Sequence, residues 1–212
     1  MSNEIISGKL VIITAPSGGG KEVAMYGLIE EHGYGRVVTC TAGREMRRGE
    51  VDGVDYHFLS VKEFERGVDN NEFFEWYPYY ETLKGTKKGE LQRAKNEILL
   101  WRIDPETAAN AKDLLRSKGL DEIADNTITI YIGVPEVRSL YRRQTERDAK
   151  TTREIALTRM RGDWEKWKKY KDKYDFVVIN KDGELKKTIE MVNDIIVRQT
   201  NSLTAGAGVM AK

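Results

Sequence analysis

The chain is poor in the residues that secreted, membrane-spanning and zinc-binding proteins need. Its 212 residues include one cysteine, Cys40, and two histidines. One cysteine cannot form a disulfide framework within the chain, and no histidine or second cysteine stands at the spacing of a zinc site. No stretch approaches the roughly 18 apolar residues of a membrane span. The start MSNEIISGKL also lacks a basic segment followed by a long apolar run, so we expect a cytoplasmic protein without membrane contact.

The chain also lacks an excess of charge of one sign. It has 35 Lys and Arg against 34 Asp and Glu, a net charge of +1. Without a strong overall field, nucleic acid and anionic membranes are not expected partners. The 40% of hydrophobic residues suffice for the core of one domain, expected over residues 1–200. Residues 201–212, NSLTAGAGVMAK, predict a flexible tail, and composition leaves both a monomer and a homodimer open.

Five short runs are apolar or β-branched at nearly every position, which is typical of strands buried on both faces of a parallel sheet. They cover residues 9–14, 36–41, 97–103, 127–134 and 176–180. Stretches with helical spacing cover residues 21–32, 62–69, 88–96, 105–118, 135–148, 151–173 and 184–198. This alternation predicts a doubly wound α/β fold.

Two segments interrupt the alternation. Residues 42–86 are rich in Gly, Arg, Glu and aromatic residues and predict a small insert packed on the sheet. Residues 138–161 hold seven arginines and predict a mobile flap. Nucleic-acid binding by these arginines is the alternative, which the balanced charge disfavours. The core would then comprise residues 8–41, 87–137 and 162–198.

The segment ITAPSGGGKEV is typical of a loop that binds phosphates. It nearly matches the pattern G-x-x-x-x-G-K-[ST], between a buried strand and a helical stretch. Its glycines let backbone N–H groups turn toward phosphate oxygens, and the helix N-terminus adds positive potential. Lys21 would reach the outer phosphates. The alternative is an ordinary Gly-rich turn, in which the proline, serine, three glycines and lysine coincide by chance.

The loop departs from the pattern at two positions. Ala15 replaces the first glycine, and its methyl group can often be accommodated. Glu22 replaces the Ser or Thr whose hydroxyl would bind Mg²⁺. A carboxylate also binds Mg²⁺, but it is longer and adds negative charge near the phosphates. The loop therefore either holds ATP with an altered metal shell or is impaired.

A second pair of cations lies in CTAGREMRRGEVDGVDYHF, residues 40–58. Arg44 and Arg47 stand three residues apart beside glycines and carboxylates. Such a pair can clamp a second phosphate group. A solvated basic turn is the alternative, and this segment alone does not decide between the two.

Together these segments resemble guanylate kinase. The family pattern S-x-T-T-R-x-x-R-x-G-E-x-x-G-x-x-Y-x-F is matched in register by Arg44, Arg47, Gly49, Glu50, Gly53, Tyr56 and Phe58. Further matches are NNEFFEW at 70–76, Gly85 with Thr86, LLWRID at 99–104, LYRRQTERD at 140–148 and YDFVVIN at 174–180. The resemblance spans most of the chain, from residue 8 to residue 198. It implies a P-loop NTPase-type parallel sheet flanked by helices, with an NMP-binding insert at 42–86 and an arginine-bearing lid at 138–161.

The resemblance implies ATP-dependent phosphorylation of GMP, and also of dGMP, with ATP and Mg²⁺ as cofactors. Glu75 would accept hydrogen bonds from the guanine N1–H and 2-amino group, two donors that adenine does not offer as a pair. Clustered cations suit the reaction, because phosphoryl transfer needs positioning and charge stabilisation.

The resemblance also implies a role for each residue of the site. The catalytic residues would be Lys21, Arg44, Arg143, Arg147 and Arg159, with Arg161 as a competitor for the last position. ATP would contact Ala15, Pro16, Ser17, Gly18, Gly19, Gly20, Lys21, Glu22, Val23 and Asn180. GMP would contact Cys40, Arg44, Arg47, Tyr56, Glu75, Lys84, Thr86 and Asp104, and Glu22 would be the metal ligand.

Three departures bear on function. Cys40 stands where the family usually has serine, and Lys84 replaces a tyrosine that usually touches the GMP phosphate. Arg102 occupies a position often filled by an acidic residue near the metal, and we expect it to pair with Glu22 so that the two charges offset each other. These departures leave two alternatives open. The chain could be a catalytically weak module that binds GMP or a protein, or a kinase for a modified purine.

Overall fold

A computed structural model describes residues 8–46, 49–79, 82–147 and 151–206. Its core is a five-stranded sheet in the order β2-β7-β1-β8-β9, in which every neighbouring pair is parallel. The strands are β1 (Lys9–Thr14), β2 (Gly35–Arg36), β7 (Ile98–Arg102), β8 (Thr127–Gly133) and β9 (Phe176–Ile179). All six residues of β1 are buried because it is the central strand. The α/β fold expected from the alternating runs is confirmed.

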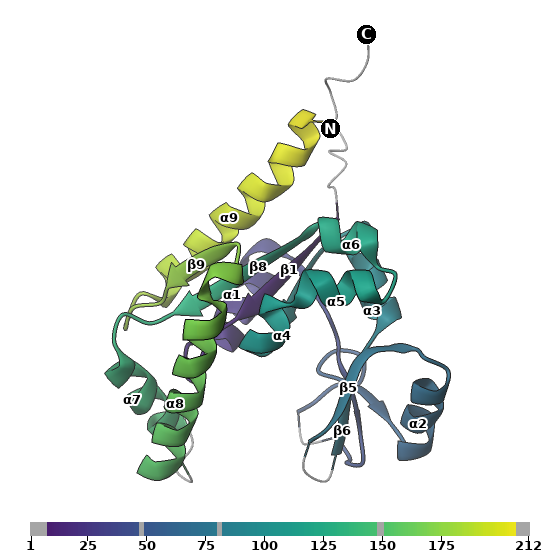
Figure 1. Ribbon diagram of the computed structural model, residues 1–212, viewed down its shortest axis with the longest axis horizontal. Helices are drawn as coiled ribbons and strands as arrows, with labels where there is room; N and C mark the ends of the chain where they lie inside the picture. Colours follow the sequence, from purple (N-terminus) through teal and green to yellow (C-terminus); the bar gives the residue numbers. More distant parts are fainter. Residues whose placement is uncertain (1–7, 47–48, 80–81, 148–150, 207–212) are drawn as a thin grey trace.

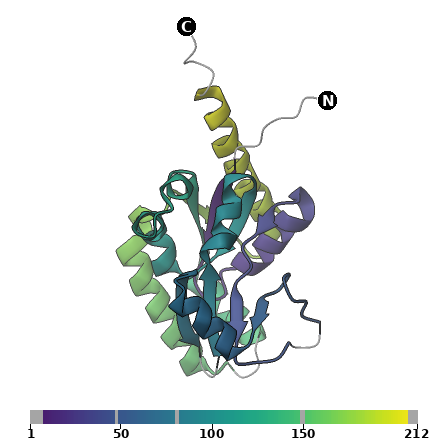
Figure 2. The ribbon, with the colours of Figure 1, turned by 90° about the vertical axis from the view of Figure 1, so that its right-hand side faces the viewer.

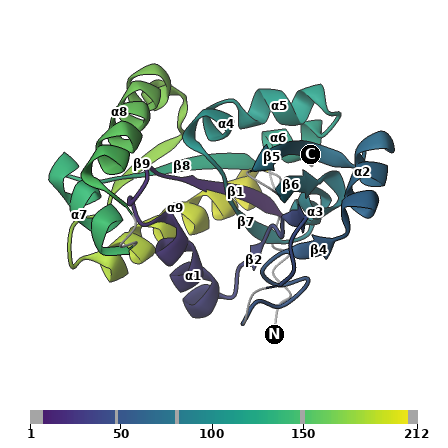
Figure 3. The ribbon, with the colours of Figure 1, turned by 90° about the horizontal axis from the view of Figure 1, so that it is seen from below.

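Helices cover both faces of this sheet (Figure 3). One face is packed by α1 (Lys21–His32) and α9 (Leu185–Gly206), which contribute Leu28 and Val192 to one buried cluster. The other face is packed by α4 (Pro105–Ala109), α5 (Ala111–Ser117), α6 (Asp121–Asp125) and α8 (Arg153–Tyr170). Trp101 lies in this second cluster and is 1% exposed.

A second sheet of four strands forms the insert, in the order β4-β3-β6-β5. Its strands are β3 (Cys40–Ala42), β4 (His57–Leu59), β5 (Phe73–Tyr79) and β6 (Thr82–Lys87), and α2 (Val61–Asp69) packs on them. The rings of Phe64 on α2 and Phe73 on β5 are stacked with centroids 4.4 Å apart. Figures 1 and 2 show the insert below the core, away from the projecting end of α9.

Three expectations about the elements need correction. The run RVVTCT is not one core strand, because Gly35–Arg36 pairs with β7 and Cys40–Ala42 pairs within the insert. The expected helix at 105–118 is two helices that meet at Asn110. Residues 201–206 of the expected tail are helical, because α9 continues through them without a proline to end it. Residues 207–212 lie outside the described residues.

The remaining elements connect the core to the insert and to the lid. A short helix α3 (Lys88–Gln92) and the 3-10 turn η1 (Arg93–Lys95) follow β6. Helix α7 (Val137–Arg147) precedes α8, and the 3-10 turn η2 (Lys171–Lys173) follows α8. Figure 1 places α7 and α8 on the opposite side of the molecule from the insert. Within the described residues, no helix is both long enough and apolar enough to span a membrane.

Candidate active site

The phosphate loop runs from the end of β1 to the start of α1. Gly18 and Gly20 have φ angles of 85° and 95°, in the left-handed region that favours glycine. A Cβ on Gly20 would also lie 2.5 Å from Nδ2 of Asn180, so only glycine fits there. The buried Ala15 is 1% exposed and joins the hydrophobic cluster on the α1 face. The core thus accommodates the methyl group that departs from the motif.

Asn180 braces this loop from the end of β9. Its side chain is buried, donates from Nδ2 to the carbonyl oxygen of Gly19 over 3.0 Å, and accepts from the Thr188 hydroxyl over 3.2 Å. The hydrogen bond from Nδ2 therefore holds the loop, and the one from Thr188 fixes the orientation of the amide. A contact between Asn180 and ATP stays a prediction.

Lys21 is the first residue of α1 and lies among several charged side chains. Burial lowers the pKa of Lys21, while the nearby Glu22 raises it and Arg102 lowers it. Arg102, at the end of β7, donates from Nη1 to Oε1 of Glu22 over 2.6 Å. The expected ion pair between these two residues is confirmed, and each charge offsets the other.

The carboxylates near the loop do not form a metal site of their own. In the part of the chain that the structure describes, no three His, Cys, Asp or Glu side chains are grouped as metal ligands. Glu22 already has one carboxylate oxygen on Arg102. Ligation of Mg²⁺ by Glu22 therefore stays a prediction that this ion pair disfavours.

The lid contributes Arg143, which lies against the phosphate loop. Its guanidinium pairs with Asp182 over 2.7 Å and donates to the carbonyl oxygens of Asn180 and Gly18 over 3.1 and 3.4 Å. Arg159 is exposed on α8. Arg147 ends α7, and its side chain lies outside the described residues. The geometry thus places Arg143 close to the loop.

Two residues that the sequence did not single out hold the loop at Ser17. The Ser17 N–H donates to Oδ2 of Asp163 on α8 over 2.7 Å, and Gln144 on α7 donates to the Ser17 carbonyl oxygen over 2.8 Å. Burial raises the pKa of Asp163, and the nearby Lys21 lowers it. The helical spacing predicted α7 and α8, but nothing in it showed which side chains reach the loop.

The expected acceptor-phosphate residues cluster on the insert. Arg44 makes two hydrogen bonds of 2.7 Å to the carboxylate of Glu50, and its guanidinium lies 5.4 Å from the Tyr56 ring centroid. Lys84 lies on the same ring, with Nζ 3.9 Å from the centroid. Arg47, the other predicted phosphate ligand, lies outside the described residues. Three of the four predicted phosphate contacts are therefore adjacent.

The expected guanine residues lie nearby on β5 and β6. Glu75 and Thr86 are paired across these strands, and the Thr86 hydroxyl donates to Oε1 of Glu75 over 2.8 Å. Burial raises the pKa of Glu75, and the negative charge of Asp104 adds to this shift. Asp104 itself caps the start of α4 through the backbone N–H groups of Glu106 and Thr107.

Cys40 is fully buried beneath this site. It lies opposite Gly85 on β6, and burial raises the pKa of its thiol to about 11. The thiol is therefore neutral near pH 7, and contact between this buried residue and GMP stays a prediction.

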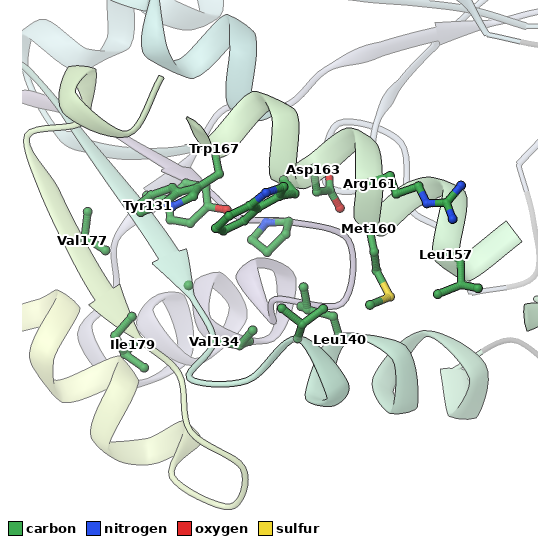
Figure 4. A pocket seen from close by; sticks show the side chains of 14 residues that line it. Tyr131, Val134, Leu140, Leu157, Met160, Arg161, Asp163, Trp167, Val177 and Ile179 are labelled. Atoms are coloured by element: carbon green, nitrogen blue, oxygen red, sulfur yellow. The ribbon is translucent and has the colours of Figure 1, made fainter. Parts of the chain in front are cut away.

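An apolar cavity of about 480 Å³ adjoins the loop between α7, α8 and the edge strand β9 (Figure 4). Trp164 on α8 is 54% exposed beside it. Trp167 does pack inward, with its ring centroid 4.6 Å from that of Tyr131. The cavity is lined by Pro16, Tyr131, Gly133, Val134, Val137, Leu140, Leu157, Met160, Arg161, Asp163, Trp164, Trp167, Val177 and Ile179.

A parallel sheet with a phosphate loop after its central strand, an insert carrying a second cationic cluster and arginine-bearing lid helices define a P-loop kinase. The guanylate kinase family model matches residues 7–199. The chain is 34% identical to guanylate kinases of onion yellows phytoplasma and Brucella melitensis. Each alignment covers 82% of this chain and 78% or 76% of the relative. The chain therefore belongs to the guanylate kinase family.

A solved structure supports the fold independently. The crystal structure of guanylate kinase from Anaplasma phagocytophilum aligns with a TM-score of 0.62 and 21% sequence identity. The alignment covers 92% of this chain and 87% of that one. At this identity the likeness concerns the fold alone.

Proposed function

We propose that the chain transfers the γ-phosphoryl group of ATP to GMP, and also to dGMP, giving ADP and the nucleoside diphosphate. The observation that carries this proposal is the half-buried Glu75, held by Thr86 on a sheet separate from the phosphate loop. An ionised carboxylate accepts from both the N1–H and the 2-amino group of guanine. The named relatives support the same reaction, and none of them favours the binding-module alternative.

The residues of the chain divide the work between the two sheets. Lys21 and the N–H groups of the loop would hold the outer phosphates of ATP. Arg44, Tyr56 and Lys84 would hold the GMP phosphate, whose oxygen attacks the γ-phosphorus as ADP leaves. Mg²⁺, carried on the ATP phosphates, would neutralise part of their charge. Arg143, Arg147 and Arg159 would steady the transferring group from the lid.

For ATP to reach the acceptor, the contacts at each site must rearrange. Arg44 is engaged by Glu50 and Arg143 by Asp182 in the structure. Each arginine would exchange some of these bonds for bonds to phosphate oxygens, for which the planar guanidinium is well suited. Reaction in the cytoplasm, by a monomer or a homodimer, is part of the proposal.

The proposal is tested by ADP formation from ATP and Mg²⁺ with GMP, dGMP, AMP, UMP or CMP as acceptor. We expect turnover with GMP and dGMP that is lost in Lys21→Ala, because charge stabilisation of the phosphates is removed. Glu75→Ala should raise the KM for GMP. Asp69→Ala, which removes an exposed carboxylate at the end of α2, is the control. GMP-independent ADP formation, or equal rates with AMP, would refute the proposal.

A further inference from the structure

The ion pair between Glu22 and Arg102 occupies the point of the loop where the motif has a metal-binding hydroxyl. Glu22 is the second residue of α1, and Arg102 ends β7, in register with Ile13 of the neighbouring β1. The pair therefore joins α1, which follows the phosphate loop, to β7, the strand beside β1. Both charges act on Lys21, which places the Arg102 guanidinium close to the lysine that reaches the phosphates.

The ion pair places a cation, rather than metal-binding oxygens, at this point. Glu22 is a poor metal ligand while one of its oxygens accepts from Arg102 over 2.6 Å. Binding of Mg²⁺ to Glu22 would also bring a divalent cation against the fixed positive charge of Arg102, which is unfavourable. The disagreement with the motif is therefore more than the loss of a hydroxyl, because a cation also stands where the family often has an acidic residue and its charge is balanced by Glu22.

Arg102 has the chemistry to bind phosphate itself. A guanidinium offers five N–H donors, and the hydrogen bond to Glu22 uses only Nη1. The Arg102 side chain is 29% exposed and that of Glu22 is 52% exposed, so the pair is half in water. Ion pairs in that setting contribute little to stability, so the guanidinium can turn its remaining donors toward a polyphosphate at low cost.

We propose that Arg102 binds the ATP phosphates directly, positioned by Glu22, and that the chain gives Mg²⁺ no ligand at this point of the loop. The inference rests on the proposed use of ATP. It predicts that nucleotide binding depends on Arg102 and only weakly on Mg²⁺. A loop with the hydroxyl would instead bind nucleotide and metal together.

The test is calorimetric titration of the protein with a non-hydrolysable ATP analogue, in Mg²⁺ and in EDTA. For the unchanged protein we expect the two Kd values to agree within about threefold. Arg102→Ala should weaken binding by about tenfold or more in both buffers, the loss expected for a hydrogen bond to a charged group. The affinity of Arg102→Lys should lie between those of the unchanged protein and Arg102→Ala, because lysine keeps the charge but lacks the planar guanidinium.

A restored motif supplies the opposite case. Glu22→Ser together with Arg102→Asp returns a hydroxyl and a carboxylate, and binding should then fall about tenfold or more when Mg²⁺ is removed. Arg116→Ala is the matched control, since Arg116 also pairs with a carboxylate, Asp125, over 2.8 Å but lies on α5. Thermal unfolding of each variant shows that it is folded before titration.

The possible results separate this inference from the proposed function. The inference would be overturned if the unchanged protein bound the ATP analogue about tenfold more weakly in EDTA than in Mg²⁺. It would also be overturned if Arg102→Ala lost no more affinity than Arg116→Ala. Turnover of GMP can persist in either case. Conversely, the protein could form no ADP in response to GMP while its binding of the ATP analogue still depends on Arg102. That result would refute the proposed kinase function and leave the inference standing.

Discussion

Under the proposed function, recognition of guanine would depend on the ionised form of Glu75, and the structure places this carboxyl where ionisation is costly. Burial raises its pKa, the nearby charge of Asp104 raises it further, and the Thr86 hydroxyl lowers it. The pair on β5 and β6 thus balances desolvation against one hydrogen bond. Because the protonated carboxyl loses acceptor capacity, affinity for GMP should follow the titration of this one group.

We therefore predict that the KM for GMP rises as the pH falls from 7 through the raised pKa of Glu75. The sign follows because a raised pKa means protonation begins at a higher pH than for an ordinary glutamate. Initial rates at several pH values, with ATP saturating, measure the effect. In Glu75→Gln the KM for GMP should be about tenfold higher or more. The rise of KM with falling pH that comes from titration of Glu75 should be absent from this variant. Identical pH profiles for the two proteins would contradict the prediction.

At the scale of elements, the lid helices contact the phosphate loop at Ser17 and Gly18. Asp163 on α8 accepts from the Ser17 N–H, and Gln144 on α7 donates to the Ser17 carbonyl oxygen. Loop N–H groups of this kind are the ones that cradle phosphates. A carboxylate bound to one of these N–H groups occupies the place of a phosphate oxygen, so we expect nucleotide and Asp163 to compete for the Ser17 N–H.

Asp163→Asn should accordingly increase the affinity for the ATP analogue by about threefold or more, because a neutral amide holds the N–H less strongly than a carboxylate. It also removes a negative charge near Lys21. Titration calorimetry measures the change, and affinity for GMP should stay the same. Asp113→Asn, on an 84% exposed side chain of α5, is the control. Weaker binding in Asp163→Asn would instead make Asp163 a ligand of the nucleotide or its metal.

Elements with a strong periodic signal could be predicted from the sequence. The runs at 9–14 and 127–134 became β1 and β8 because central strands are apolar throughout. The run RVVTCT could not be divided correctly, since its pairing partners, β7 and β6, lie far along the chain. The strands of the insert were missed as well, because they lack the continuous apolar runs of the core strands.

The same distinction holds for the site. Motif residues such as Lys21 and Gly20 follow each other in the chain, so their spacing alone revealed them. The partners Asp163 and Asn180 approach the loop from 146 and 161 residues away, and only the fold brings them there. The pair of Glu22 and Arg102 was predictable because both departed from a motif whose two positions are known to be adjacent.

At the scale of the whole molecule, the two proposed nucleotide sites lie on different sheets, which the chain joins at a hinge of two crossings. The chain crosses between the sheets after β2 and again at the start of α3. Glu90 on α3 anchors this hinge, since its carboxylate contacts the Val38 N–H, His57 and Arg93 over 3.1, 3.2 and 2.9 Å. Figure 1 shows the insert and the lid helices on opposite sides below the core.

Direct transfer requires the two sites to approach and to exclude water, so both nucleotides together should draw the insert toward the lid. The buried Cys40, with its pKa raised to about 11, should leave two introduced cysteines as the reactive thiols. Dyes on Lys62→Cys in α2 and Glu154→Cys in α8, both exposed, would report the distance by energy transfer.

We expect the transfer efficiency to rise with GMP and the ATP analogue together, and to rise less with either one alone. The control pair is Asp113→Cys and Lys187→Cys, which lie on α5 and α9 of the core and should show no change. The reason for the difference is that core helices pack on one sheet, whereas the insert is a separate sheet that meets the core at the hinge and where the Phe74 ring packs on Trp101. An unchanged efficiency with both nucleotides bound would mean that the sites meet by side-chain motion alone.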